Sequence, residues 1–177
     1  SSCVLKAETL RLNGENGRKI DLGLVGQVVE VNAHLLNALC AAGTIPVIAP
    51  IAEDSTGGRL NVNADSAAGK VAAAVQAEKL VVVSDTHGVL TDMNDPNSWV
   101  SSLNETQIKE MIDAGIITDA MFPKVEACII ALDGGAKKAH IIDGRIEHSL
   151  LLEIYTDKGV GTQIIKNGKQ NIEEAKV

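Results

Sequence analysis

The amino-acid sequence predicts an α/β fold, a three-layer αβα sandwich in which helices cover both faces of a mainly parallel central sheet. Three observations support this prediction. The chain has 177 residues, 45% of them hydrophobic and 22% charged, enough to bury the core of about one domain. Its first 30 residues are rich in β-forming residues, and helix and strand patterns alternate after them. No internal repeat or domain boundary is visible, so residues 1–177 are expected to form a single domain.

The chain is expected to begin with a β-hairpin followed by a helix. Apolar-rich segments at 4–10 and 19–31 flank the sequence NGENG (13–17), which has the composition of a hairpin turn. Asn32 is a favoured helix-capping residue, and apolar residues recur behind it with helical spacing until Gly43. A helix is therefore predicted between these two residues.

The remaining segments alternate between strands and helices. Short apolar runs predict strands at 45–51, 80–84, 138–142 and 161–165, and the first of them (IPVIAPI) is expected to be buried on both faces. Helices are predicted at 65–77, 104–114 and 123–132, with a short helical turn at 150–154. Asp65 is expected to cap the first of these helices. Gly115 is expected to end the second, and Gly134 and Gly135 the third. The polar residues 166–177 are expected to fray.

The composition excludes several classes of function. The chain has 16 Lys and Arg against 23 Asp and Glu, a net charge of −7, and only 2% aromatic residues, which disfavours nucleic-acid binding. No apolar run is long enough to cross a membrane, and the first residues lack the layout of a signal peptide. Three cysteines lie far apart (Cys3, Cys40 and Cys128), so we expect no disulfide framework and a reducing, cytoplasmic location.

In sheets of the predicted kind, ligands bind beyond the carboxyl ends of the strands, which directs attention to polar loops there. The sequence SDTHGVL (84–90) places a carboxylate and a glycine directly after a strand, either to receive a ribose or phosphates or to form an Asx-turn. In NVNAD, three polar residues (Asn61, Asn63 and Asp65) precede a helix, where they either hold an anionic ligand or simply cap the helix.

Lys124 follows Pro123 in the first turn of a predicted helix, where the helix dipole disfavours a cation. A phosphate bound at that point would explain the lysine, and the alternative is an exposed side chain that reaches water. The four histidines have no metal-binding spacing, so no metal site is expected. His148 and Glu153 are either two residues on the rim of one pocket or merely structural. No cysteine has a neighbouring base, which disfavours a nucleophilic role.

Taken together, three segments resemble one protein family. The segments are NVNADSAAGKVAAAVQAEKLVVVSDTHGVL (61–90), IITDAMFPKVEACIIAL (116–132) and AHIIDGRIEHSLLLEIYTDKGVGTQI (139–164). They resemble the C-terminal, nucleotide-binding part of the acetylglutamate kinases, a branch of the amino acid kinase family, and the likeness runs from about residue 22 to 165. The resemblance implies an amino acid kinase-like C-terminal lobe. It also implies that the lobe carrying a glycine-rich loop and a substrate-gripping arginine is missing from these residues, so the chain alone is expected to be incomplete.

The activity that the resemblance implies is transfer of a phosphoryl group from ATP, with Mg²⁺, to the side-chain carboxylate of N-acetyl-L-glutamate in arginine biosynthesis. Such a carboxylate is already ionised at neutral pH, so no general base is needed, and catalysis comes from positioning and charge neutralisation. Two alternatives stay open: a non-catalytic module that binds nucleotide or arginine, and another member of the amino acid kinase family. A homo-oligomer is expected of the full-length protein.

The resemblance also assigns candidate site residues. Lys124 matches a lysine that stabilises the transition state, Asp65 an aspartate that organises the catalytic lysines, and Asn61 a substrate-binding asparagine. The residues matched to the nucleotide site are Asp85, Thr86, His87, Gly88, Val89 and Leu90 on one side and Ile116, Ile117 and Thr118 on the other. Those matched to an arginine effector site are His148, Glu153, Gly159 and Gly161. Ala120 replaces a usual glycine, and an apolar pair is more usual at positions 86 and 87.

Overall fold

The computed structural model describes residues 3–13, 19–92, 94–95, 97–118, 120–156 and 159–167. All but the first residue of the predicted hairpin turn (13–17) and the tail beyond residue 167 lie outside the described residues. Within the described ranges, no helix is both long and apolar enough to span a membrane.

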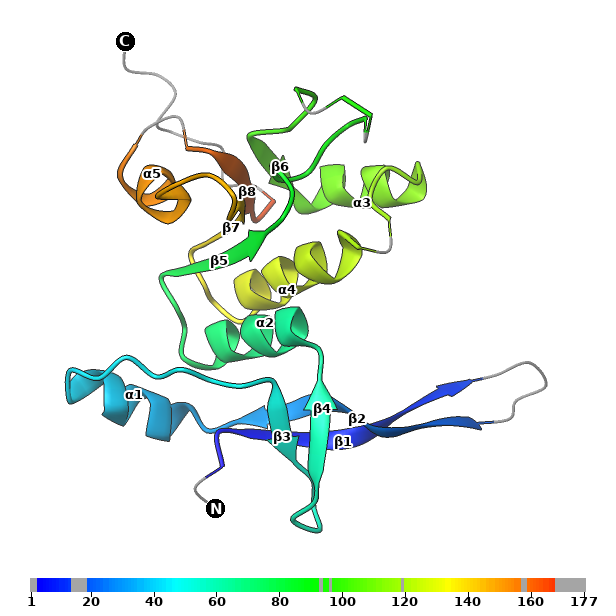
Figure 1. Cartoon of the computed structure of the whole chain (residues 1–177), viewed down its shortest axis with the longest axis vertical. Helices are drawn as coiled ribbons and strands as arrows, with labels where there is room; N and C mark the ends of the chain where they lie inside the picture. Colours follow the sequence, from blue (N-terminus) through cyan, green and yellow to red (C-terminus); the bar gives the residue numbers. More distant parts are fainter. Residues whose placement is uncertain are drawn as a thin grey trace.

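The first strands close into a small barrel, drawn in blue and cyan in Figure 1. Strand β1 (Leu5–Asn13) pairs with β2 (Lys19–Val31) in antiparallel fashion, which confirms the predicted pairing of these segments. β2 pairs with β4 (Arg59–Val62), β4 with β3 (Ile51–Glu53), and β3 with β1, which closes the ring. Alternate residues point inward and pack together, as expected of barrel strands, among them Leu5, Ala7, Val28, Leu60 and Val62.

The second sheet has the order β5 (Lys79–Ser84), β7 (Lys138–Asp143), β8 (Gly161–Ile165) and β6 (Ser102–Asn104). β5 pairs with β7 and β6 with β8 in parallel, while β7 and β8 are antiparallel. The sheet is therefore mainly parallel, as predicted. Because successive side chains of a strand point to opposite faces, Ala139 and Ile141 enter the main core while His140 meets the opposite face.

Helices complete the sandwich (Figure 1). α4 (Phe122–Asp133) packs on β5 and β7, and α2 (Ala64–Ala74) packs on α4, so that these two helices cover one face. α5 (Ser149–Tyr155) contacts β7 through Glu153 and His140 on the other face, which gives the predicted three layers. α1 (Ala33–Ala41) lies beside the barrel and α3 (Glu105–Asp113) beside β6. Asn32 caps α1, as predicted, and Asn104, where the predicted third helix begins, caps α3.

Three local predictions are wrong. Residues 45–51 do not form the buried strand that was predicted. Only Ile51 belongs to a strand, β3, and Ile45 and Val47 are 90% and 96% exposed. Two prolines at 46 and 50 carry no N–H to donate, and among the described residues no strand pairs with residues 45–50. The cap of α2 is Asn63 and not, as was predicted, Asp65. Oδ1 of Asn63 accepts a hydrogen bond from the N–H of Ser66 at 2.9 Å, and Asp65 lies in the first turn of the helix.

The short strands β4 and β6 were not predicted, because each runs directly into a helix cap.

Candidate functional site

One pocket opens beyond the carboxyl end of β5, between the loop that follows this strand and the start of α4. Its lining residues are Ser84, Asp85, Thr86, Gly88, Val89, Leu90, Ile116, Ile117, Thr118, Ala120, Met121 and Lys124. Eight of the nine residues matched to a nucleotide site thus share one pocket with Lys124, although they come from segments more than 25 residues apart. His87 is the exception, since it turns away toward Asp143.

The pocket has an apolar side and a polar side. Val89, Ile117 and Met121 are apolar and wholly or partly buried, so they form a slot of the kind that accepts a flat, weakly polar ring. Asp85 and Lys124 bring charged groups to the same cavity. An apolar slot beside a lysine fits the two ends of a nucleotide, its base and its phosphates.

The loop after β5 is held against β8. Gly88 has a φ of +117°, and a side chain there would lie 2.5 Å from Oγ1 of Thr162, so the position requires glycine. The N–H of Val89 donates to the same Thr162 oxygen at 2.9 Å, and the Thr162 hydroxyl donates to the carbonyl of Val100 at 2.6 Å. These hydrogen bonds of Thr162 therefore fix this wall of the pocket.

Lys124 and Asp65 meet at the first turns of α4 and α2. Nζ of Lys124 donates to Oδ2 of Asp65 at 3.0 Å, and the two side chains are 22% and 24% exposed. The two helices approach closely because Gly69 has no side chain, and a Cβ there would lie 2.6 Å from the carbonyl oxygen of Ala127. The carboxylate offsets the positive charge that the lysine brings to a helix N-terminus. The sequence alone did not reveal this pairing.

The other polar residues of NVNAD have separate roles. Asn63 caps α2, so the capping interpretation is correct for this residue. Asn61 belongs to β4 and its neighbours Leu60 and Val62 are buried in the barrel, which leaves Asn61 exposed. Asn61 is not among the residues that line the pocket.

Cys128, a buried residue of α4, is not poised to act as a thiolate nucleophile. Burial, with a smaller effect of the Asp65 charge, raises the pKa of the Cys128 thiol to about 12. The Cys128 thiol is therefore protonated at neutral pH. In the part of the chain that the structure describes, no three His, Cys, Asp or Glu side chains gather in a way that could hold a metal ion.

The residues matched to an arginine effector site are only partly brought together. Glu153 is buried on the inner side of α5, where its Oε1 lies 2.6 Å from Nδ1 of His140. Its Oε2 accepts the N–H groups of Val160 and Gly161 at 2.7 and 3.1 Å, and Gly159 lies against the same carboxylate. The hydrogen bond from His140, followed by these N–H groups, lowers the pKa of Glu153 despite burial. His148 is exposed, 3.5 Å from Glu147.

Acid should remove part of the stability of this fold through Asp143. The hydrogen bonds from Arg145 lower the pKa of this buried carboxyl from 3.8 to about 2. Because the folded-state pKa is lowered, the stabilisation is present above the unfolded value of 3.8 and is lost as the pH falls toward 2. We therefore expect the thermal midpoint to drop between pH 4 and pH 2, and to drop less in Asp143→Asn. Equal drops in both proteins, measured by circular dichroism, would contradict this assignment.

The chain is similar to known proteins of one family. Residues 2–143 match the model of the amino acid kinase family. The chain is 51% identical over 146 residues to an acetylglutamate kinase of Moorella thermoacetica, a match that covers 82% of this chain and 49% of that protein. It is 47% identical over 163 residues to an acetylglutamate kinase of Symbiobacterium thermophilum, covering 92% and 56%. The chain thus spans about half the length of the curated relatives it matches.

Solved structures share the fold. N-acetylglutamate synthase from Neisseria gonorrhoeae, complexed with coenzyme A and L-arginine, superimposes with a TM-score of 0.79 at 24% identity, over 92% of this chain and 36% of that chain. Carbamate kinase from Giardia lamblia bound to AMP-PNP superimposes with a TM-score of 0.63 at 16% identity, over 93% and 52%. These likenesses confirm the predicted α/β sandwich.

Proposed function

Because the chain belongs to the amino acid kinase family, we propose that it forms the nucleotide-binding part of an acetylglutamate kinase. The observation that carries the proposal is the pocket beyond β5, where an apolar slot, a glycine loop and Lys124 meet. Relatives that are 47–51% identical over most of the chain bear the name acetylglutamate kinase, which supports the same reaction. Residues 1–177 would act as one C-terminal lobe.

In the proposed reaction, ATP supplies the phosphoryl group and the acceptor is the side-chain carboxylate of N-acetyl-L-glutamate. We propose that residues 85–90 and 116–118 hold the nucleotide, and that the ammonium group of Lys124 neutralises charge on the phosphoryl group. Asp65, hydrogen-bonded to Lys124 at 3.0 Å, would keep that ammonium in place. Asn61 would contact the acceptor. The acceptor carboxylate has no proton to remove, so none of these residues needs to act as a base.

Mg²⁺ would accompany ATP. Among the described residues no side-chain cluster could hold a metal ion by itself, so the phosphates would have to supply many of its ligands. We also propose a cytoplasmic location and a homo-oligomeric full-length protein.

L-arginine is a candidate effector, since the synthase that shares the fold was solved with L-arginine. His148, Glu153, Gly159 and Gly161 would surround it. Both oxygens of Glu153 already have partners in this structure, so binding of a guanidinium by this carboxylate would require that some of these partners are exchanged.

The reaction is tested by fusing this chain behind the N-terminal half of the Moorella relative, which restores the length of the matched proteins. With Mg²⁺ and ATP, the fusion should form an acyl phosphate of N-acetyl-L-glutamate that hydroxylamine traps as a hydroxamate. L-Glutamate, L-aspartate and carbamate are the competing acceptors. Turnover of one of these in preference to N-acetyl-L-glutamate would contradict the proposed substrate.

Ala120 offers a mild test of the pocket. Its methyl group lines the cavity where the resemblance implies a glycine, and a glycine would let the backbone approach the phosphates more closely. Ala120→Gly is therefore expected to lower the dissociation constant for Mg–ATP a few-fold, as measured by calorimetry. A higher dissociation constant would show that the methyl group favours binding.

A further inference from the structure

A buried carboxylate joins the two loops that leave the sheet beside the pocket. Asp143 is the last residue of β7 and lies opposite Ser84, the last residue of β5. Just beyond this pair, the N–H of Gly144 donates to the carbonyl of Ser84 at 2.8 Å. The loop after β5 and the loop after β7 therefore leave the sheet side by side.

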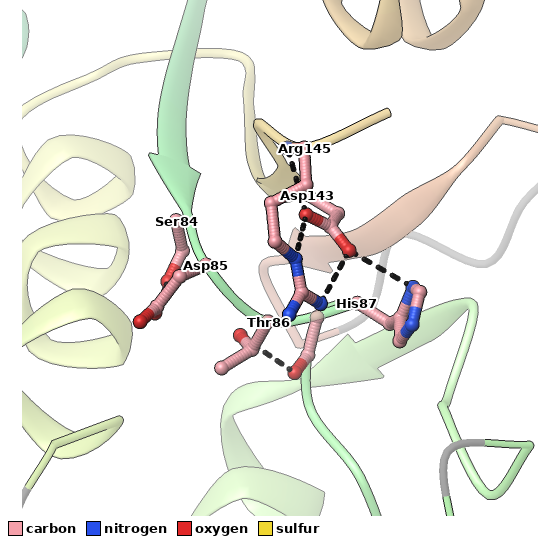
Figure 2. Close-up of polar contacts among 7 residues, drawn as sticks. Ser84, Asp85, Thr86, His87, Asp143 and Arg145 are labelled. Carbon is pink, nitrogen blue, oxygen red and sulfur yellow. Dashed lines mark hydrogen bonds and ion pairs between the residues drawn. The ribbon is translucent and has the colours of Figure 1, made fainter. Parts of the chain in front are cut away.

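The carboxylate of Asp143 is shared by partners from both loops, as Figure 2 shows. Its Oδ1 accepts hydrogen bonds from the backbone N and Nε of Arg145, both at 2.9 Å, and Oδ2 accepts one from Nη2 at 2.8 Å. Nδ1 of His87 lies 3.0 Å from the same Oδ2. Asp143 itself is only 1% exposed. A buried carboxylate with one partner removed is strongly unfavourable, so both loops are constrained to stay near it.

His87 connects this carboxylate to the pocket wall. Thr86 and Gly88, the residues on either side of His87, line the pocket, whereas His87 points to Asp143 (Figure 2). The contact with Asp143 thus selects which side of the loop faces the cavity. Beyond His87, the N–H of Val89 is held by Thr162. Asp143 therefore anchors the loop at His87, and Thr162 anchors it at Val89.

Arg145 acts on the charge of the pocket. Its hydrogen bond to Asp143 raises the pKa of the guanidinium, and the charges of Asp143 and then Asp85 raise it further. Asp85 lines the pocket, where a bare carboxylate would repel phosphates. The two hydrogen bonds from the Arg145 guanidinium to Asp143 keep its positive charge where it interacts with Asp85. This positive charge reduces the repulsion between Asp85 and the phosphates.

We propose that Asp143 is a positioning residue of the nucleotide pocket. Through His87 it fixes the loop at 85–90, and through Arg145 it keeps a positive charge near Asp85, while it lines no part of the cavity itself. The proposal rests on the nucleotide-binding function proposed above. It assigns a role to Asp143, Arg145 and the His87 side chain beyond the residues that line the pocket.

The test compares Asp143→Asn with Glu78→Gln. Glu78 pairs with Lys137 at 3.4 Å, just before β5 and β7 begin, so this control removes a carboxylate between the same strands at their opposite ends. Amide hydrogen exchange without nucleotide should become roughly tenfold faster at 86–90 in Asp143→Asn and stay unchanged in the control. The dissociation constant for Mg–ATP, measured by calorimetry, should rise roughly tenfold, which corresponds to about 1.4 kcal/mol.

A double-mutant comparison separates positioning from general stability. His87→Gln should show part of both effects, and it should add little to Asp143→Asn because both variants remove the same contact. If Asp143→Asn does not fold, the proposal is tested with His87→Gln alone, by hydrogen exchange at 86–90 and by the dissociation constant for Mg–ATP. The His87 side chain is 43% exposed, so its replacement should be tolerated. Faster exchange spread evenly over β7 and α4, or a loop unchanged in either variant, would overturn the proposal. Failure of the wild-type chain to bind ATP would instead overturn the proposed function, and the exchange data would still decide the positioning role.

Discussion

Lys124→Ala is expected to slow phosphoryl transfer by the fusion protein by roughly 10²–10³-fold, the loss typical when one charge-stabilising group is removed from an active site. The reason is that Lys124 is the lysine that lines the pocket, at the first turn of α4. Binding of Mg–ATP should weaken much less, because the apolar slot remains. Turnover is measured by hydroxamate trapping at saturating ATP, and binding by calorimetry.

Two further lysine variants make this result specific. Lys109→Ala removes an exposed lysine of α3 that is not among the pocket residues, and it should leave turnover and ATP binding unchanged. Lys124→Arg keeps the charge with a different shape and should retain more turnover than alanine. If Lys124→Ala and Lys109→Ala have the same turnover, Lys124 has no role in the transfer step.

Asp65→Asn is expected to lower turnover roughly 10²-fold in the same fusion, the size of effect that follows when a reacting group is displaced by about 1 Å. The amide keeps the shape of the side chain but loses the charge that holds Nζ of Lys124 at 3.0 Å. Affinity for ATP should stay within a few-fold. Raising the pH should not restore turnover, because no deprotonation is involved.

The structure makes this experiment cleaner than the sequence suggested. Asn63, and not Asp65, caps α2, so the variant does not remove the cap hydrogen bond to Ser66. What remains is the interaction of a first-turn carboxylate with the helix dipole, worth about 0.3–1 kcal/mol at exposed sites. The thermal midpoint measured beside the kinetics will show that contribution. An acidic limb in the wild-type pH–rate profile that disappears in Asp65→Asn would contradict the organising role and indicate proton transfer.

The order of elements could be predicted because local signals and tertiary structure agree in most of this chain. Asn32 caps α1, the helix predicted at 104–114 forms as α3, and the apolar run at 80–84 becomes β5. The segment 45–51 shows where this reasoning fails. Its apolar pattern resembles that of a buried strand, but strand formation requires a pairing partner, which a sequence pattern does not reveal.

The sequence could predict which segments form the site, but not which of their side chains contact one another. Family resemblance placed Gly88 and Ile117 at one site, and they do share a pocket. Resemblance did not indicate that His87 would point to Asp143, because that contact depends on the register of β5 and β7. The ion pair between Lys124 and Asp65 depends on the close approach of α2 and α4 and is likewise absent from any local pattern.

The most direct test of this account is a titration of the 177-residue chain with Mg–ATP, followed residue by residue by NMR. We expect saturable binding at millimolar ATP or below, with the amide shifts concentrated at 85–90 and 116–118 and at Lys124. Lys124→Ala should weaken the same titration without moving the affected region. Shifts that stay at the noise level at millimolar ATP, or that gather on the barrel strands β1–β4 instead, would contradict the assignment of this pocket to the nucleotide.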